Sequence, residues 1–113
     1  MKRTLCAALA LLPMLAAAHH GWSEYDQSNT LTLSGRVADM GYEHPHGYVK
    51  LITPQKTWLA VLAPPSRMDN RGLARDMITP GSTVQVVGYA NRSKPDEMRA
   101  ERIIVAGKTV ELR

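Results

Sequence analysis

Cysteine is nearly absent from this 113-residue sequence, because the only one is Cys6, near the amino terminus. Cys6 lies in a segment that we expect to be removed, so the remaining chain can form no internal disulfide. Lipidation of Cys6 is not indicated, because a lipidated cysteine follows an apolar segment rather than lying in its first turn. The folded part must therefore be stabilised by its apolar core, which a single domain of this length can provide.

Long hydrophobic runs and clusters of basic residues are also missing. The longest apolar stretch, residues 5–15, is shorter than the about 20 residues that a membrane-spanning helix needs. The net charge is +4, and two of these charges come from Lys2 and Arg3, which leaves +2 for the rest of the chain. A nucleic-acid-binding protein would instead carry a clustered basic face. We therefore expect neither a membrane span nor a nucleic-acid partner.

Residues 1–18 have the pattern of a secretory signal peptide: a basic start, an apolar stretch over residues 5–15 and three alanines before His19. The peptidase prefers small side chains at the last and third-last positions of the leader, and cleavage after Ala18 satisfies both. Cleavage after Ala17 places a leucine at the third-last position and is the alternative. We therefore expect a periplasmic protein whose mature chain begins at His19, or else at Ala18.

Beyond the leader, residues 19–29 are polar with isolated aromatic side chains and are predicted to form a mobile N-terminal arm. From residue 30 onward, the alternation of apolar and polar side chains predicts strands, and one segment with helical spacing lies among them. The expected strands cover residues 30–40, 48–52, 57–63, 83–90 and 98–106, and residues 109–112 end the chain. The expected helix is capped by Ser66 and runs to about Met77, and Gly35 is expected at a bulge or a sharp bend.

Three strands, one helix and two further strands follow one another in the order of an OB-fold. We therefore predict an all-β domain with one short helix, a small five-stranded OB-fold-like barrel over residues 30–113. A small open meander is the alternative. Closure is favoured because it removes the strand edges that an exported domain without disulfides would otherwise expose.

Several short motifs occur together in an order that is typical of one family. They are Ala18-His19-His20, Ser34-Gly35-Arg36-Val37, His44-Pro45-His46, Trp58, Arg71-Gly72-Leu73, and Pro80-Gly81 followed by Val84, Val86 and Gly88. In this arrangement the chain resembles the small exported bacterial proteins of domain of unknown function family 6152. It differs at His44, where the family pattern more often has asparagine. The resemblance implies export and a small β-barrel, and it implies no specific function.

All four histidines fall into two clusters, His19 with His20 and His44 with His46. Imidazole nitrogen suits Cu(II), Ni(II) and Zn(II). If His19 is the mature N-terminus, its α-amino nitrogen and its ring could chelate copper, and His44 or His46 could complete a three-nitrogen site. If the chain begins at Ala18, the first three residues could bind Cu(II) or Ni(II) by themselves. The alternative is that all four are solvated or turn-forming histidines.

A second candidate site lies on the expected barrel face. OB barrels bind ligands on the second and third strands, together with the loops after the first and fourth strands. The corresponding aromatic and basic side chains here are Tyr42, Tyr48, Lys50, Arg92 and Lys94. Trp58 is expected to be a core residue rather than a binding platform. Arg67, Arg71 and Arg75 recur every four residues and are expected on a solvated helix face.

These patterns predict a monomeric periplasmic protein that binds copper through His19, His20, His44 and His46, as a carrier or sensor rather than an enzyme. The serines occur in no nucleophile motif, which is why a hydrolase is not expected. The alternative is a metal-free OB-type interaction module that binds a saccharide, a peptide or an envelope protein.

Overall fold

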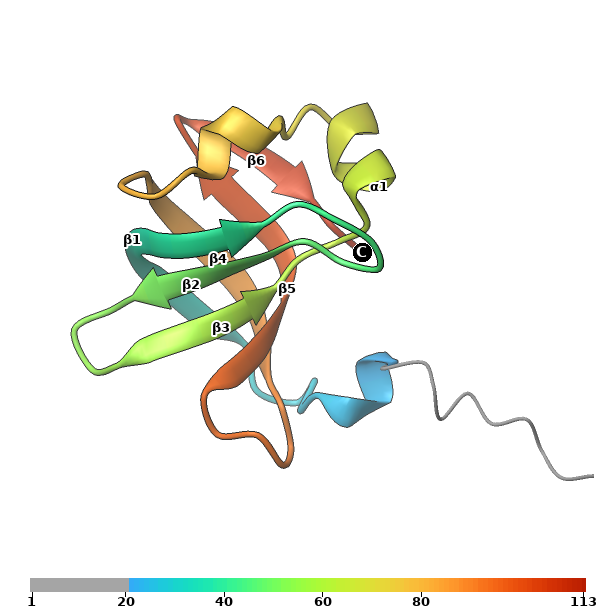
Figure 1. The fold of residues 1–113 in the computed structure, drawn as a ribbon. Helices are drawn as coiled ribbons and strands as arrows, with labels where there is room; N and C mark the ends of the chain where they lie inside the picture. Colours follow the sequence, from blue (N-terminus) through green and yellow to red (C-terminus); the bar gives the residue numbers. More distant parts are fainter. Residues whose placement is uncertain (1–20) are drawn as a thin grey trace, which may run out of the picture.

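The computed structural model describes residues 21–113, so the predicted signal peptide and the pair His19 and His20 lie outside the described residues. In chain order, its helices and strands are η2 (Trp22–Glu24), β1 (Leu31–Gly41), β2 (Tyr48–Ile52), β3 (Thr57–Val61), α1 (Pro65–Asn70), η3 (Arg75–Ile78), β4 (Thr83–Ala90), β5 (Glu97–Val105) and β6 (Lys108–Glu111). Figure 1 shows these elements in space. The expected strands are present, with bounds that differ by one or two residues.

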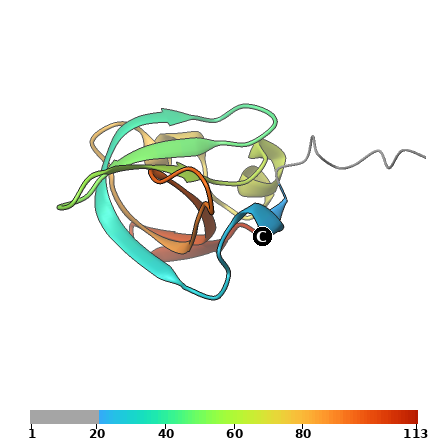
Figure 2. The same cartoon turned by 90° about the horizontal axis from the view of Figure 1, so that it is seen from below.

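The strands form a closed barrel, as predicted. They are hydrogen-bonded in the order β3-β2-β1-β4-β5-β6, and β3 also pairs with β5. This last pairing is parallel, joins Leu59 to Glu97 and Val61 to Arg99, and closes β1 to β5 into a ring. Seen from below in Figure 2, the strands curve around a common interior. The segment at residues 108–111 adds a strand, β6, which pairs with β5 outside the ring.

The long strand β1 serves both sides of the barrel, pairing with β4 over its first half and with β2 over its second half. The shift in register on the β2 side falls between Val37 and Asp39 rather than at Gly35. Gly35 has a different role, because a side chain there would overlap the backbone carbonyl of Ile52. The sequence signal for an irregularity in this strand was therefore correct, but its position was displaced by two residues.

The core fills the barrel and continues under the segment between β3 and β4. Alternate strand positions point inward, as the period-two pattern requires. The fully buried strand residues are Val37, Val49, Leu51, Ala60, Val86, Met98, Ala100 and Ile103. The crossover segment adds Met68, Leu73 and Ile78, which are also fully buried and close the barrel at one end. A disulfide-free domain is thus stabilised by one continuous apolar cluster.

The single helix expected from Ser66 to about Met77 is instead two short helices, α1 and η3. Pro64 precedes α1 as its N-cap and Ser66 lies inside the helix, so the predicted serine cap is wrong. The break follows from Gly72, whose φ of +88° ends the helix and turns the chain inward so that Leu73 is buried. Among residues 21–113, no helix is long and apolar enough to cross a membrane.

Of the three arginines expected on a solvated helix face, Arg67 and Arg71 contact the C-terminal strand, although Arg71 is also exposed. Arg67 Nη1 donates to the carbonyl of Leu112 at 3.0 Å, and Arg71 Nη1 donates to the carbonyls of Glu111 at 2.8 Å and Arg113 at 3.0 Å. These carbonyls belong to the end of β6 and the residues after it. The guanidinium groups therefore cover backbone acceptors at a strand edge, which would otherwise be open to pairing with another chain. Arg75, the third of these arginines, is exposed as expected.

Gly88 provides a test of the close β4–β5 packing. A Cβ atom at Gly88 would overlap the backbone carbonyl oxygen of Arg99, so Gly88→Ala must force two hydrogen-bonded strands apart. We expect this substitution to lower the free energy of unfolding by about 3 kcal/mol, measured by urea denaturation with tryptophan fluorescence. Gly81→Ala is the control, because its φ is +97° but nothing lies within 4 Å of the added atom. It should cost only about 1 kcal/mol of backbone strain, and equal losses would contradict the role assigned to Gly88.

Candidate ligand-binding site

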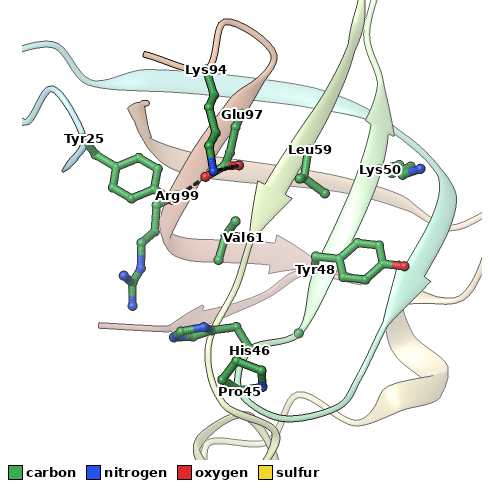
Figure 3. A pocket seen from close by; sticks show the side chains of 11 residues that line it. Tyr25, Pro45, His46, Tyr48, Lys50, Leu59, Val61, Lys94, Glu97 and Arg99 are labelled. Atoms are coloured by element: carbon green, nitrogen blue, oxygen red, sulfur yellow. Dashed lines mark hydrogen bonds and ion pairs between the residues drawn. The ribbon is translucent and has the colours of Figure 1, made fainter. Parts of the chain in front are cut away.

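A pocket of about 390 Å³ opens on the outer face of the barrel where β2, β3 and β5 lie side by side (Figure 3). The strand register builds its floor from two rows of side chains, Tyr48–Val61–Arg99 and Lys50–Leu59–Glu97. Each row crosses all three strands, because β3 pairs with β2 on one side and with β5 on the other. The volume lies within the range of small-molecule sites, and the middle of the floor is aliphatic.

Three segments that are distant in sequence form the rim of the pocket. The loop between β1 and β2 contributes Pro45 and His46, the loop between β4 and β5 contributes Lys94, and the N-terminal segment contributes Tyr25. Figure 3 shows these side chains around Leu59 and Val61. His44 is exposed and does not line the pocket, so only one histidine of the predicted loop pair faces it.

Glu97 contacts three polar side chains at the pocket. Its Oε2 atom accepts hydrogen bonds from the hydroxyl of Tyr25 at 2.6 Å and from Nδ2 of Asn91 at 3.3 Å. Its Oε1 atom lies 3.9 Å from Nζ of Lys94. Burial, together with the hydrogen bond to Glu97, raises the pKa of Tyr25 far above its ordinary value. The Tyr25 hydroxyl therefore stays protonated and remains a donor to Glu97.

The N-terminal segment is packed against the barrel and is not a mobile arm. The side chain of Tyr25 is only 2% exposed, and its backbone forms a β-bridge with Asn91. The centre of the Trp22 ring lies close to two guanidinium groups, 4.4 Å from that of Arg99 and 4.3 Å from that of Arg113. Cation–π contacts that are shielded from water, as on the Arg99 side, stabilise by about 2 kcal/mol. This segment is therefore a fixed wall of the pocket.

The electrostatic character of the pocket is basic. Arg99 is 7% exposed, and burial is the main cause that lowers its pKa, with smaller effects from the charges of Arg67 and Arg113. A guanidinium group stays charged in proteins despite such shifts, so Arg99 brings a cation to this end of the pocket, on which the charge of Glu24 also acts. Lys50 is exposed at the other side, and among residues 21–113 no carboxylate lies within ion-pair distance of it.

Of the predicted ligand-face residues, the structure places Tyr48, Lys50 and Lys94 at the pocket and the other two elsewhere. The Tyr42 hydroxyl donates to the carbonyl of Leu73 at 2.6 Å, which turns this ring toward the helical crossover. Arg92 Nε donates to the carbonyl of Ser23 at 3.0 Å and so anchors the N-terminal segment.

Trp58 packs against the core at the rim of the barrel rather than forming a platform. Its ring is half-buried and carries the Lys56 ammonium 4.1 Å above its centre.

Sequence reasoning missed several pocket residues, namely Tyr25, Leu59, Val61, Glu97 and Arg99. The alternation of Glu97, Met98 and Arg99 already marks Glu97 and Arg99 as outward-facing, whereas the apolar run at residues 58–61 gives no such signal for Leu59 and Val61. What it could not give is the parallel pairing of β3 with β5, which joins segments that are almost forty residues apart. Tyr25 carried no signal, because an isolated aromatic in a polar segment has no periodicity.

Only two of the four predicted copper ligands, His44 and His46, belong to the described residues. Among residues 21–113, no group of three or more histidine, cysteine or carboxylate side chains is arranged to hold a metal ion. His44 and His46 are described, and they do not converge on one point of the pocket. His19 and His20 lie outside the described residues, so the four-histidine site stays a prediction.

Comparison with known proteins identifies the family but no activity. The chain belongs to the family of unknown function DUF6152, whose profile matches residues 7–98. No curated protein sequence matches the chain.

Among solved structures, the chain is similar to a part of TiaS in a crystal structure of its complex with an isoleucine tRNA, AMPCPP and agmatine. The TM-score is 0.53 and the identity 23%, over 79% of this chain and 20% of that chain. It is also similar to a ZRD-deleted mutant of TiaS in complex with agmatine, with a TM-score of 0.51 and 20% identity, over 78% of this chain and 25% of that chain. The chain thus spans about a quarter or less of those proteins, and the likeness concerns the fold alone.

Tyr25 provides a test of the pocket wall. Tyr25→Phe removes the hydroxyl that donates to Glu97, and we expect the free energy of unfolding at pH 7 to fall by about 1–2 kcal/mol. Because the pKa of Tyr25 is raised in the folded state, the hydroxyl stabilises the fold fully below pH 10 and loses this effect as pH rises above it. Urea denaturation of both proteins from pH 7 to 11.5 should therefore show a difference that shrinks above pH 10. A difference that is constant with pH would contradict the bonded, protonated Tyr25.

Proposed function

We propose that this chain is an exported, metal-free binding module that takes a small organic ligand, or one unit of a larger one, in the pocket over β2, β3 and β5. Export rests on the pattern of residues 1–18, and the periplasm is the compartment that it implies. The observation that carries the proposal is the convergence of two rows of outward side chains and three rim segments on one cavity. OB barrels bind their ligands on this face and between these loops.

The composition of the pocket supports binding. Leu59 and Val61 place aliphatic groups on the solvent side of the barrel, where strand positions are ordinarily polar. Polar and charged side chains surround them, the combination that is typical of small-molecule sites. Catalysis is a less suitable proposal, because Glu97, the carboxylate among the lining residues, is already bonded by Tyr25, Asn91 and Lys94.

A pocket-filling substitution tests this proposal. Val61→Tyr places a ring in the cavity from the outer side of β3, so the core is left unchanged. Thr57→Tyr is the matched control, because Thr57 lies on the same strand and face but does not line the pocket. We expect small-molecule fragments, screened by ¹H–¹⁵N NMR, to shift the amides of residues 46–50, 59–61 and 97–99. Val61→Tyr should abolish these shifts and Thr57→Tyr should keep them, whereas fragments that leave all pocket amides unmoved would refute the proposal.

Copper binding is the second candidate, and one observation favours it. Tyr25 and His46 line the same pocket, so the chain before Tyr25 begins close to a histidine. Trp22–Glu24 is helical and held in place by the contacts of Trp22, so only His19 and His20, which reach about 7 Å from Gly21 when extended, could carry the mature N-terminus toward His46. The proposed ligands are the α-amino group and ring of His19 together with His46, and His20 is the donor if the chain begins at Ala18.

The two loop histidines provide a matched pair to test copper binding. The protein must be purified from the periplasm after native processing, without an N-terminal tag, and its intact mass gives the first residue. We expect His46→Ala to weaken Cu(II) binding by at least about tenfold, and the exposed His44→Ala to leave it unchanged. Titration followed by EPR measures both effects. Weak binding of undefined stoichiometry in the unmodified protein, or equal behaviour of the two variants, would exclude His46 as a specific ligand.

A further inference from the structure

The charges of the pocket do not balance. Lys50, Lys94 and Arg99 are basic, and Glu97 is the acidic residue among those that line it. Glu97 already has partners, because Lys94 lies 3.9 Å from one oxygen and the other accepts two hydrogen bonds. Among residues 21–113 no carboxylate lies within ion-pair distance of Lys50, so its charge makes the pocket suit an anionic ligand rather than a cationic one.

The pocket has two sides that differ in their side chains. The β5 and β2 side chains lie two strand spacings apart, about 10 Å, with Leu59 and Val61 of β3 between them. In Figure 3, Lys50 and Tyr48 lie on one side of this aliphatic floor, and Arg99 and Tyr25 lie on the other. Lys50 has no carboxylate partner within ion-pair distance among residues 21–113, so its ammonium is available to a ligand.

The backbone of the pocket cannot recognise an extended peptide. β2 pairs with β1 and β3, and β3 pairs with β2 and β5, so neither strand offers a free edge under the cavity. A peptide that binds by strand addition needs such an edge. Recognition must therefore depend on side chains, which favours a compact molecule or the end of a chain.

Resting on the proposed function, we propose that the ligand is a carboxylate with a short apolar body. The body lies over Leu59 and Val61, and the carboxylate accepts hydrogen bonds from the ammonium of Lys50. The Tyr48 hydroxyl, two residues before Lys50 on the same face of β2, is a second donor on that side. Such a group could belong to a free aliphatic acid or to the C-terminal residue of a peptide, since both present the same chemistry.

Matched acid and amide probes test this inference. Hexanoate and hexanamide represent the free acid, and N-acetyl-leucine and N-acetyl-leucinamide represent a peptide end. We expect the acids to bind about tenfold more tightly than the amides at low ionic strength, measured by NMR titration of the pocket amides. The advantage should shrink as salt is raised, because Lys50 is exposed and its charge is screened.

Variants that remove one positive charge test whether Lys50 causes the preference for acid over amide. Lys50→Gln should reduce the preference for acid over amide to about twofold or less. Arg36→Gln is the control, because Arg36 is an exposed basic residue of β1 that does not line the pocket, and it should leave the preference intact. Loss of the preference in both variants would contradict a specific role for Lys50.

The possible results separate this inference from the proposed function. Binding of hexanoate supports a free acid, and binding of N-acetyl-leucine alone supports a peptide end. Equal binding of acids and amides at the pocket overturns the carboxylate proposal and leaves the binding module standing. If none of the four probes shifts a pocket amide, the carboxylate proposal is overturned, and the fragment screen decides separately whether the pocket binds anything.

Discussion

The parallel pairing of β3 with β5 is the contact on which both the barrel and its pocket depend. It consists of three residue pairs, from Leu59 with Glu97 to Val61 with Arg99. Without it, β3 and the first residues of β5 would be open edges, and a disulfide-free domain would expose backbone groups on both. The same pairing aligns the aliphatic side chains of β3 with the charged side chains of β5. Closure of the fold and assembly of the pocket floor are therefore one event.

Closure also explains why the N-terminal segment packs where it does. Once Glu97 and Arg99 are fixed beside β3, Glu97 provides an acceptor for the Tyr25 hydroxyl and Arg99 provides a cation for the Trp22 ring. Each contact also satisfies a group that would be costly to bury alone, because a partly buried carboxylate and a buried guanidinium both need partners. The segment thus provides neutral partners for charged groups that closure buries, and it forms a wall of the pocket in doing so.

Much of the fold could be predicted from local patterns, whereas the site could be predicted only in part. Alternation located the strands, and their order around one crossover indicated the barrel, because both signals are carried by neighbouring residues. Tyr48, Lys50 and Lys94 were found because they belong to the strands and loops that OB barrels use. Tyr25 and Arg99 were missed because their positions depend on long-range pairing. The continuous helix was wrong because the positive φ of Gly72 and the burial of Leu73 outweigh helical spacing.

The charge of the pocket also bears on the choice between the two proposed ligands, since both would use the cavity beside His46. A copper ion would add a cation to a pocket that already contains the exposed ammonium of Lys50, and like charges oppose its entry. A carboxylate meets the opposite situation, because the same ammonium attracts it. If both fit without overlap, the electrostatic part of their coupling is favourable, since a carboxylate in the pocket reduces the repulsion that copper experiences and linkage makes this effect reciprocal. The electrostatics of the described residues therefore favour an anionic ligand over a metal ion as the first occupant of the pocket.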